Sequence, residues 1–212
     1  MPDIRYEDEA LLILEKPPGV LVHPIAGDPS PTLWHEVAAY YEQKGWRLQI
    51  HPVSRLDRYT SGLVLFAKFP EIQGQLIKQG IRKEYLALVT DPLPQAYGVI
   101  EAPIARKPGS IIERVIDPAG KPCKTEYWAV QQNKETGLTL VRCRLYTGRT
   151  HQIRVHLAGI GCPLWQDGLY GKVKGPQQRH GLHSCKLSFR HPWTGVWIEV
   201  ISALPEDLRR QL

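Results

Sequence analysis

One short segment of the chain concentrates residue types that could do chemistry. It runs His51-Pro-Val-Ser-Arg-Leu-Asp-Arg-Tyr-Thr-Ser-Gly62 and places Asp57 between two arginines, just before an apolar stretch. Positive charge nearby favours the ionised form of a carboxyl group, and an ionised aspartate held by hydrogen bonds can act as a nucleophile. A structural alternative is stronger on residue types alone: Asp57 could cap the Thr60-Ser-Gly62 turn and neutralise an arginine.

A second segment, Gly148-Arg-Thr-His-Gln-Ile-Arg-Val-His156, is rich in basic residues. It predicts a turn, a helix cap at Thr150 and a helix whose apolar residues form a buried stripe. His151 and Arg154, three residues apart, would then be neighbours on the other face of the helix. A helix N-terminus that carries Arg149, His151 and Arg154 suits a phosphate or a carboxylate. The alternative is an amphipathic helix with a solvated basic face.

The histidines do not have the spacing of a metal site. His151 and His156 are five residues apart rather than the four of a helical metal-binding pair, and no carboxylate accompanies them at ligand spacing. The sequence also lacks a Gly-rich phosphate loop that ends in Lys-Ser or Lys-Thr. We therefore expect neither a metal ion nor an organic cofactor.

Two strand-like segments carry further candidates. One face of Leu138–Tyr146 bears Arg142 and Arg144, which could follow a phosphate backbone. An ordinary solvent-facing row of charge explains them equally well. Tyr85 lies in the second segment, Lys83–Thr90, and a tyrosine in a strand usually belongs to the core.

Composition limits the class of protein. The 212 residues are 42% apolar, which is enough for the core of a single domain, and 27 basic against 21 acidic residues give a net charge of +6. This surplus favours polyanions as partners. No apolar run approaches the about 20 residues of a membrane span, and the start of the chain lacks the apolar core of a signal peptide. We therefore expect a cytoplasmic protein whose four cysteines are reduced, mostly buried thiols.

Hydrophobic periodicity predicts the elements that position these residues. Helices are expected at 33–44, capped by Thr32, and at 71–79. Strands are expected at 11–14, 63–67, 83–90, 97–101, 124–131, 138–146 and 182–190. Runs of strands interrupted by a few helices predict an α+β fold with a mixed, largely antiparallel central sheet and flanking helices.

Four segments, in this order, resemble the motifs of the RluA-like family of pseudouridine synthases. They are Leu14–Pro24, Arg55–Leu63, Lys83–Val89 and Gly148–His156. The resemblance implies the pseudouridine synthase fold, with a catalytic cleft across the sheet, and one catalytic domain over residues 1–212 without an N-terminal S4-like RNA-binding module. It also implies that a specific uridine in rRNA, tRNA or both is flipped out of its stack and isomerised to pseudouridine.

The resemblance assigns roles to individual residues. Asp57 stands at the position of the catalytic aspartate, Tyr85 at that of the tyrosine that stacks on the target base and assists proton removal, and Arg154 at that of the basic group that pairs with the aspartate. Arg55 would lie near the gap left by the displaced nucleotide. The other predicted RNA-binding residues are Thr60, Arg149, His151, Arg142 and Arg144.

The chain departs from the family pattern at three positions: Ser54, Gln166 and Tyr59, which is bulkier than the residue usual at its position. Ser54 stands where many members carry histidine, which puts a base contact there in doubt. Gln166 stands where glycine is common.

The expected partner is RNA, without DNA or a membrane, and the expected state is a monomer. Two other classes remain open. A non-catalytic RNA-binding protein on the same scaffold would bind RNA without forming pseudouridine. A hydrolase that uses Asp57 with a metal ion would be inhibited by chelators.

Overall fold

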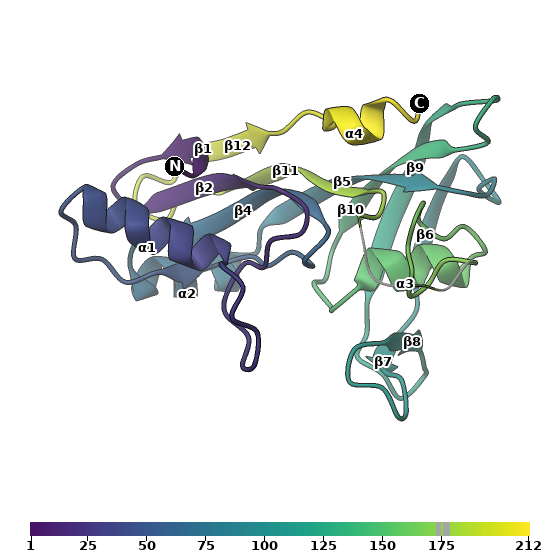
Figure 1. Cartoon of the computed structure of the whole chain (residues 1–212), viewed down its shortest axis with the longest axis horizontal. Coiled ribbons are helices and arrows are strands. Elements are labelled where there is room, and N and C mark those ends of the chain that lie inside the picture. The colour runs from purple at the N-terminus through teal and green to yellow at the C-terminus, as the bar shows by residue number, and fades with distance from the viewer. Residues whose placement is uncertain (173–174, 176–178) are drawn as a thin grey trace. The chain divides into compact units, whose positions relative to one another are not determined.

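A computed structural model describes residues 1–172, 175 and 179–212 (Figure 1). The chain divides into two compact units, which are described separately. The first unit comprises Met1–Arg82 and Ser184–Ala203, and the second comprises Lys83–His183 and Leu204–Leu212. The chain passes between them inside strand β5 (Arg82–Val89), inside strand β11 (Leu182–Arg190) and shortly after strand β12 (Trp197–Ile201).

The first unit is built on a sheet in which most of the neighbouring strands are antiparallel. Its strands, besides most of β11 and all of β12, are β1 (Asp3–Glu7), β2 (Leu11–Lys16), β3 (His51–Pro52) and β4 (Ser61–Ala67). The order is β1-β2-β4-β11, with β3 paired to β4 and β12 paired to β11.

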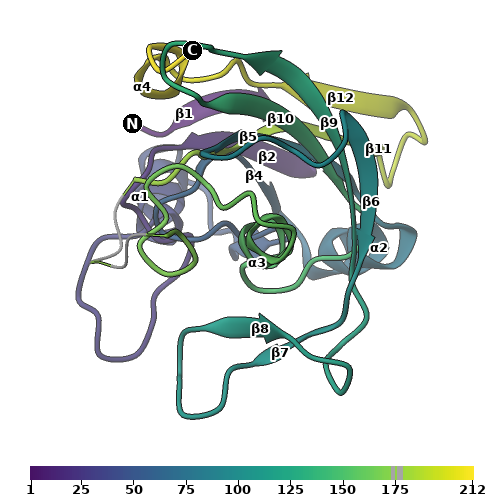
Figure 2. The same cartoon turned by 90° about the vertical axis from the view of Figure 1, so that its right-hand side faces the viewer.

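Two helices cover opposite faces of this sheet. Alternate residues of β2 enter two different cores: Leu11 and Ile13 pack with α2 (Pro70–Gln79), whereas Leu12 and Leu14 pack with α1 (Leu33–Gln43) (Figure 2). A strand that is buried on both faces needs a continuous apolar run rather than an alternating one. Each fully buried leucine or isoleucine stabilises the fold by about 1.5–3 kcal/mol.

Gly62 permits a close approach of strands β4 and β11. Its φ is +111°, and a Cβ atom at this position would lie 2.3 Å from the backbone oxygen of Ser184. Both the left-handed backbone and the lack of space require glycine. Strand packing therefore explains why the Asp57 segment ends in a glycine.

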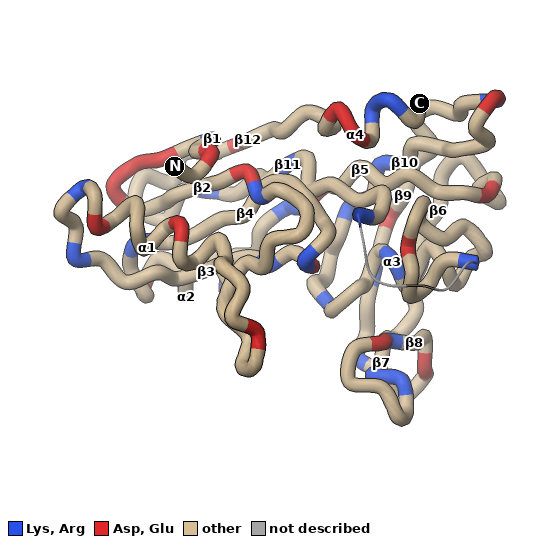
Figure 3. The backbone as a smooth tube through the Cα atoms, in the orientation of Figure 1, with Lys and Arg blue, Asp and Glu red and all other residues tan. Residues whose placement is uncertain are grey.

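The second unit has an antiparallel sheet with the order β5-β10-β9-β6. Its strands, besides β5, are β6 (Tyr97–Glu101), β9 (Lys124–Gln132) and β10 (Thr139–Leu145). Between β6 and β9 the chain forms a small hairpin of β7 (Ile104–Arg106) and β8 (Arg114–Ile116), which carries charges of both signs (Figure 3).

The two faces of the second sheet are covered by different helices. On one face, Leu88 and Leu140 form a core with Leu208 of α4 (Glu206–Arg209). On the other, the Oγ1 of Thr125 in β9 is bonded to two side chains of α3 (Gln152–Gly159). Tyr127 lies on this second face, because it is two residues beyond Thr125 in β9. Cys143 of β10 pairs with Tyr127 on one side and with Tyr85 of β5 on the other, so Tyr85 lies on the same face.

The α+β class with a largely antiparallel sheet is confirmed. Each of the seven predicted strands and the helices predicted at 33–44 and 71–79 exist, with ends within about two residues of those expected. Thr32 is the N-cap of α1, as predicted. Strands β1, β3, β7, β8 and β12 and the short helix α4 were not predicted.

All four cysteines are buried, as expected. None of the helices in the described part of the chain is long and apolar enough to span a membrane.

Candidate active site

Asp57 lies in a half-buried turn between β3 and β4. Its carbonyl oxygen accepts the backbone N–H of Thr60 at 3.1 Å, which closes the turn. The next carbonyl, that of Arg58, accepts the N–H of Gly19 at 2.8 Å and the Nζ of Lys16 at 2.9 Å. The backbone of Asp57 and of the residue after it is therefore fixed.

Lys16 joins two motifs that are distant in the sequence. Its side chain is completely buried, and its Nζ also donates to the carbonyl oxygens of Pro17 and Val20 at 2.8 Å each. A buried ammonium group is tolerated when its donors are satisfied. The lysine of the Lys-Pro-Pro-Gly segment thus positions the Asp57 turn through the carbonyl of Arg58.

The neighbours of Asp57 have different environments. Arg55 is exposed, and Arg58 forms an ion pair with Asp28. Thr60, which was predicted to contact RNA, is only 1% exposed, and this burial favours a role in the turn itself. The hydroxyl of Ser54 is also buried and accepts the N–H of Leu65 in β4 at 3.1 Å, so this residue serves the strand pair.

Arg154, in α3, is held by a partner that the sequence did not reveal. Its Nε donates to Oδ2 of Asp167 at 2.8 Å, and its Nη2 donates to Oδ1 at 2.9 Å. The arginine and aspartate side chains are 1% and 0% exposed. A two-point fork of this kind fixes the plane of the guanidinium group. The alternative, an amphipathic helix with a solvated basic face, is therefore wrong at Arg154. Its predicted pairing with Asp57, which belongs to the other unit, stays a prediction.

Asp167 is ionised despite its burial. Burial raises the pKa of its carboxyl group, but the hydrogen bonds and charge of Arg154 lower the pKa more, so that the net shift is downward. Oδ1 also accepts the backbone N–H groups of Leu169 and Tyr170, at 3.0 and 3.1 Å. These bonds form a turn typical of an aspartate that precedes a glycine-rich stretch.

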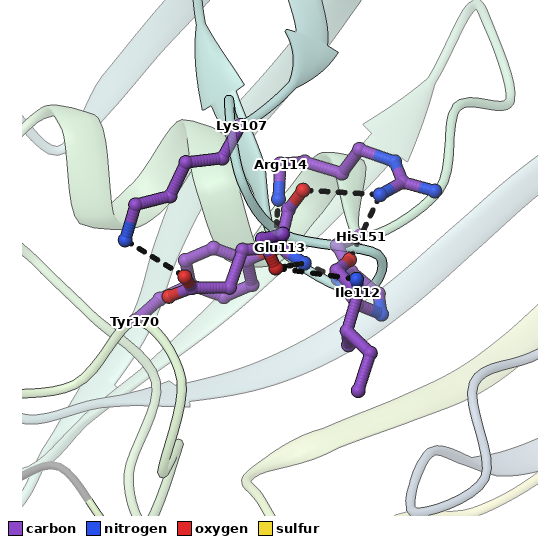
Figure 4. A network of polar contacts seen from close by, with 7 residues as sticks. Lys107, Ile112, Glu113, Arg114, His151 and Tyr170 are labelled. Carbon is purple, nitrogen blue, oxygen red and sulfur yellow. Dashed lines mark hydrogen bonds and ion pairs between the residues drawn. The ribbon is translucent and has the colours of Figure 1, made fainter.

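Helix α3 begins differently from the prediction. It starts at Gln152, and its N-cap is His151 in a left-handed conformation (φ 58°), so Thr150 is not the cap. The side chain of Gln152 replaces the expected cap contact. It accepts the N–H of Arg149 at 3.0 Å and donates to the carbonyl oxygen of Lys124 at 3.0 Å. Because the chain turns sharply at His151, its ring lies against Tyr170 (Figure 4).

Tyr85 forms part of a row that crosses the second sheet. It is 6% exposed and lies opposite Cys143, which lies opposite Tyr127 on β9. Gly98 follows on β6, where a Cβ atom would lie 2.5 Å from the Tyr127 ring. Tyr85 thus shares a sheet face with α3, the helix that carries Arg154.

Arg142 and Arg144 lie on the opposite face of this sheet from Tyr85. Arg142 is exposed, and the guanidinium groups of both arginines lie over the ring of Trp128, with Cζ at 4.7 and 5.3 Å from its centroid. Arg144 forms ion pairs with Glu84 and Glu126 at 3.2 and 3.6 Å. The two arginines therefore do not extend the surface around Tyr85, and their contact with RNA stays a prediction.

Three supporting residues were missed from the sequence: Lys16 in the first unit, and Asp167 and Tyr170 in the second. The signal for Asp167 and Tyr170 is the Asp-Gly-Leu-Tyr-Gly171 turn, in which an aspartate precedes two glycines. Within residues 1–172, 175 and 179–212, no three His, Cys, Asp or Glu side chains gather closely enough to hold a metal ion.

Comparisons with known proteins agree with the motifs. Residues 10–159, which contain Asp57, Tyr85 and Arg154, match the family described as RNA pseudouridylate synthase. The chain is 39% identical over 212 residues to the uncharacterized RNA pseudouridine synthase YjbO of Bacillus subtilis, covering 98% of this chain and 74% of that protein.

A second relative is the ribosomal large subunit pseudouridine synthase D of Nitrosomonas europaea, with 37% identity over 218 residues that cover 97% of this chain and 62% of the relative. Among solved structures, human RNA Pseudouridylate Synthase Domain Containing 1 superposes with a TM-score of 0.80 at 23% identity, over 100% of this chain and 87% of that one, which supports the fold.

Fold and sequence together define a pseudouridine synthase. The chain belongs to the RNA pseudouridylate synthase family, and its activity is the isomerisation of uridine in RNA to pseudouridine.

Proposed function

We propose that Asp57 is the catalytic aspartate and that Tyr85 and Arg154 act on the same uridine. The strongest support is that Asp57 and Arg154 are each held in place by a buried charged residue. Lys16 holds the Asp57 turn, and Asp167 holds the guanidinium group of Arg154. Catalytic groups need such rigid support, because a small misplacement is costly in rate.

The reaction breaks the bond between N1 of uracil and C1′ of the sugar and joins C5 to the same carbon. A stacked uridine cannot be reached, so the nucleotide has to be flipped out at a cost of a few kcal/mol. In this proposal Asp57 acts while the glycosidic bond breaks, and Arg154 supplies the positive charge that the family motif pairs with the aspartate. Tyr85 stacks on the ring and lies near the C5 proton that leaves.

The detached uracil has to rotate before it is rejoined. Water has to be excluded during this step, because hydrolysis would otherwise compete. Neither a metal ion nor an organic cofactor is required by this sequence of steps.

The proposed substrate is ribosomal RNA of the large subunit, with tRNA as the alternative. Support comes from the names of relatives such as the ribosomal large subunit pseudouridine synthase D proteins of Nitrosomonas europaea and Escherichia coli. Exposed Arg55 and Arg149 and half-buried His151 are proposed to contact the RNA. The protein is proposed to act as a monomer in the cytoplasm.

A deletion strain tests the substrate and the reaction together. Pseudouridines are mapped across all rRNA and tRNA before and after deletion, and after complementation with the wild-type gene or with Asp57→Asn. The expected result is the loss of a site in large-subunit rRNA that only the wild-type gene restores. Loss confined to tRNA would overturn the rRNA assignment, and restoration by Asp57→Asn would overturn the catalytic role of Asp57.

A further inference from the structure

Tyr170 lies where three parts of the second unit meet. The Cζ of Arg154 lies 5.0 Å from the centroid of its ring. Its hydroxyl accepts the backbone N–H of Arg114 in β8 at 2.8 Å and is hydrogen-bonded to Nδ1 of His151 at 2.8 Å (Figure 4). Its own backbone N–H donates to Oδ1 of Asp167. One side chain thus touches the arginine, the start of α3 and the hairpin.

The ring and the fork restrain Arg154 in different directions. The fork with Asp167 uses Nε and Nη2, which fixes the guanidinium within its plane and leaves Nη1 outside the fork. The ring of Tyr170 covers one face of the guanidinium, where a cation is attracted to the π electrons. Movement perpendicular to the plane is therefore limited by the ring.

The hydroxyl fixes the hairpin at one end of α3. At the other end, Ile116 of β8 packs so closely on Gly159 that a Cβ atom there would lie 2.5 Å from its Cδ1. The hairpin itself is closed by the ion pair between Lys107 and Glu113 at 2.7 Å (Figure 4). The hairpin therefore packs on α3 near the C-terminal end of the helix. At the N-terminal end it is connected to the N-cap residue, His151, through the hydroxyl of Tyr170.

We propose that Tyr170 is a positioning residue for the reaction: its ring orients Arg154, and its hydroxyl holds the β7–β8 hairpin against the N-terminus of α3. The inference rests on the proposed role of Arg154. It predicts that the two parts of one side chain have separable effects.

The test uses substitutions that remove the two parts in turn. Tyr170→Phe keeps the ring and loses the hydroxyl, whereas Tyr170→Met and Tyr170→Leu lose both. Tyr40→Phe is the matched control, because it removes another buried hydroxyl, which donates to Glu7 at 2.7 Å in the first unit. Single-turnover rate constants at saturating RNA, RNA affinity and thermal midpoints are measured for each full-length protein.

Tyr170→Phe is expected to keep the rate constant within a few fold of wild type but to speed tryptic cleavage in the hairpin, after Arg106 or Arg114. Tyr170→Met is expected to lower the rate constant at saturating RNA by roughly tenfold or more, as misorientation of a reacting group does. The control changes neither quantity. A wild-type rate constant in the folded Met or Leu variant, or unchanged cleavage in Tyr170→Phe, would overturn the proposal.

A double-mutant cycle with Arg154→Lys separates positioning from general loss of structure. If the ring acts through Arg154, Tyr170→Met should cost little further rate in the Arg154→Lys background. If the two substitutions act independently, the fold-losses in rate constant multiply in the double variant. A merely structural role of Tyr170 predicts this result, which would contradict the proposal. If Arg154→Lys alone kept the wild-type rate, the proposed function of Arg154 would fail instead, so the two failures are distinguishable.

Discussion

Arg154 and Asp167 form a buried, doubly hydrogen-bonded ion pair, with 2.8 Å from Nε to Oδ2 and 2.9 Å from Nη2 to Oδ1. An isolated charge in such surroundings would be very costly. Asp167 therefore allows a charged arginine to be kept inside the second unit, on the sheet face that also carries Tyr85. The pair contributes little net stability, because the cost of desolvating both charged groups offsets much of their attraction. Its main effect is to orient the guanidinium group of Arg154.

Asp167→Asn should lower the free energy of unfolding by about 3–5 kcal/mol, because it leaves the Arg154 charge buried without its counter-charge. Urea unfolding at pH 7 measures the effect. The matched control is Asp91→Asn, which breaks an ion pair to the exposed Lys172 and should cost no more than about 1 kcal/mol. Equal losses in the two variants would contradict this account of the buried pair.

Acid should destabilise the protein partly through Asp167. Its pKa is lowered in the folded state, so the stability it contributes is present above the unfolded pKa of about 3.9 and is lost as the pH falls through the lower folded value. The wild type should therefore lose stability more steeply than Asp167→Asn below about pH 4. Unfolding free energies of both proteins between pH 6 and about pH 3 check this; parallel curves would refute it.

Lys16→Met should affect both stability and catalysis. Three carbonyl oxygens would lose a buried donor, and we expect a net loss of about 1–3 kcal/mol, because removal of the charge also removes a desolvation cost. The Asp57 turn would loosen, so the rate should fall more than RNA affinity. Lys78→Met, an exposed position in α2, is the control. An unchanged single-turnover rate would show that Lys16 does not position the aspartate.

Gln166→Gly should keep or raise stability. Gln166 has a φ of 56°, a left-handed conformation that costs a non-glycine residue about 1–2 kcal/mol, partly offset by the greater flexibility of glycine in the unfolded chain. A net gain of up to about 1 kcal/mol is expected from thermal unfolding. Gln166→Val should be destabilising, since β-branched residues avoid this region. A loss of stability in the glycine variant would contradict the argument from strain.

The sheet was predictable because its residues follow simple periodicities. Side chains in Lys83–Thr90 and 138–146 alternate between the two faces of a strand, and the run that begins at Leu11 reflects a strand between two helices. Strands β7 and β8 have three residues each, too few for a period to be visible. Asp57, Tyr85 and Arg154 were found through motifs and not through periodicity.

Supporting residues were harder to predict because their partners are distant in the chain. Lys16 bonds to Arg58, 42 residues later, and Arg154 bonds to Asp167 across an irregular segment. The Thr150 cap was wrong because a left-handed His151 ends the turn and Gln152 takes over the polar contacts. A left-handed residue and an ion pair between distant residues cannot be predicted from the residue types of a short segment.

The catalytic role of Asp57 is the central claim, and single-turnover pseudouridine formation by Asp57→Asn tests it most directly. RNA affinity is measured in parallel, and Glu9→Gln, an exposed carboxyl in the same unit, serves as the control. The account predicts no product from Asp57→Asn, with RNA affinity within a few fold of wild type and full activity in the control. Appreciable turnover by the asparagine variant would remove Asp57 from the mechanism.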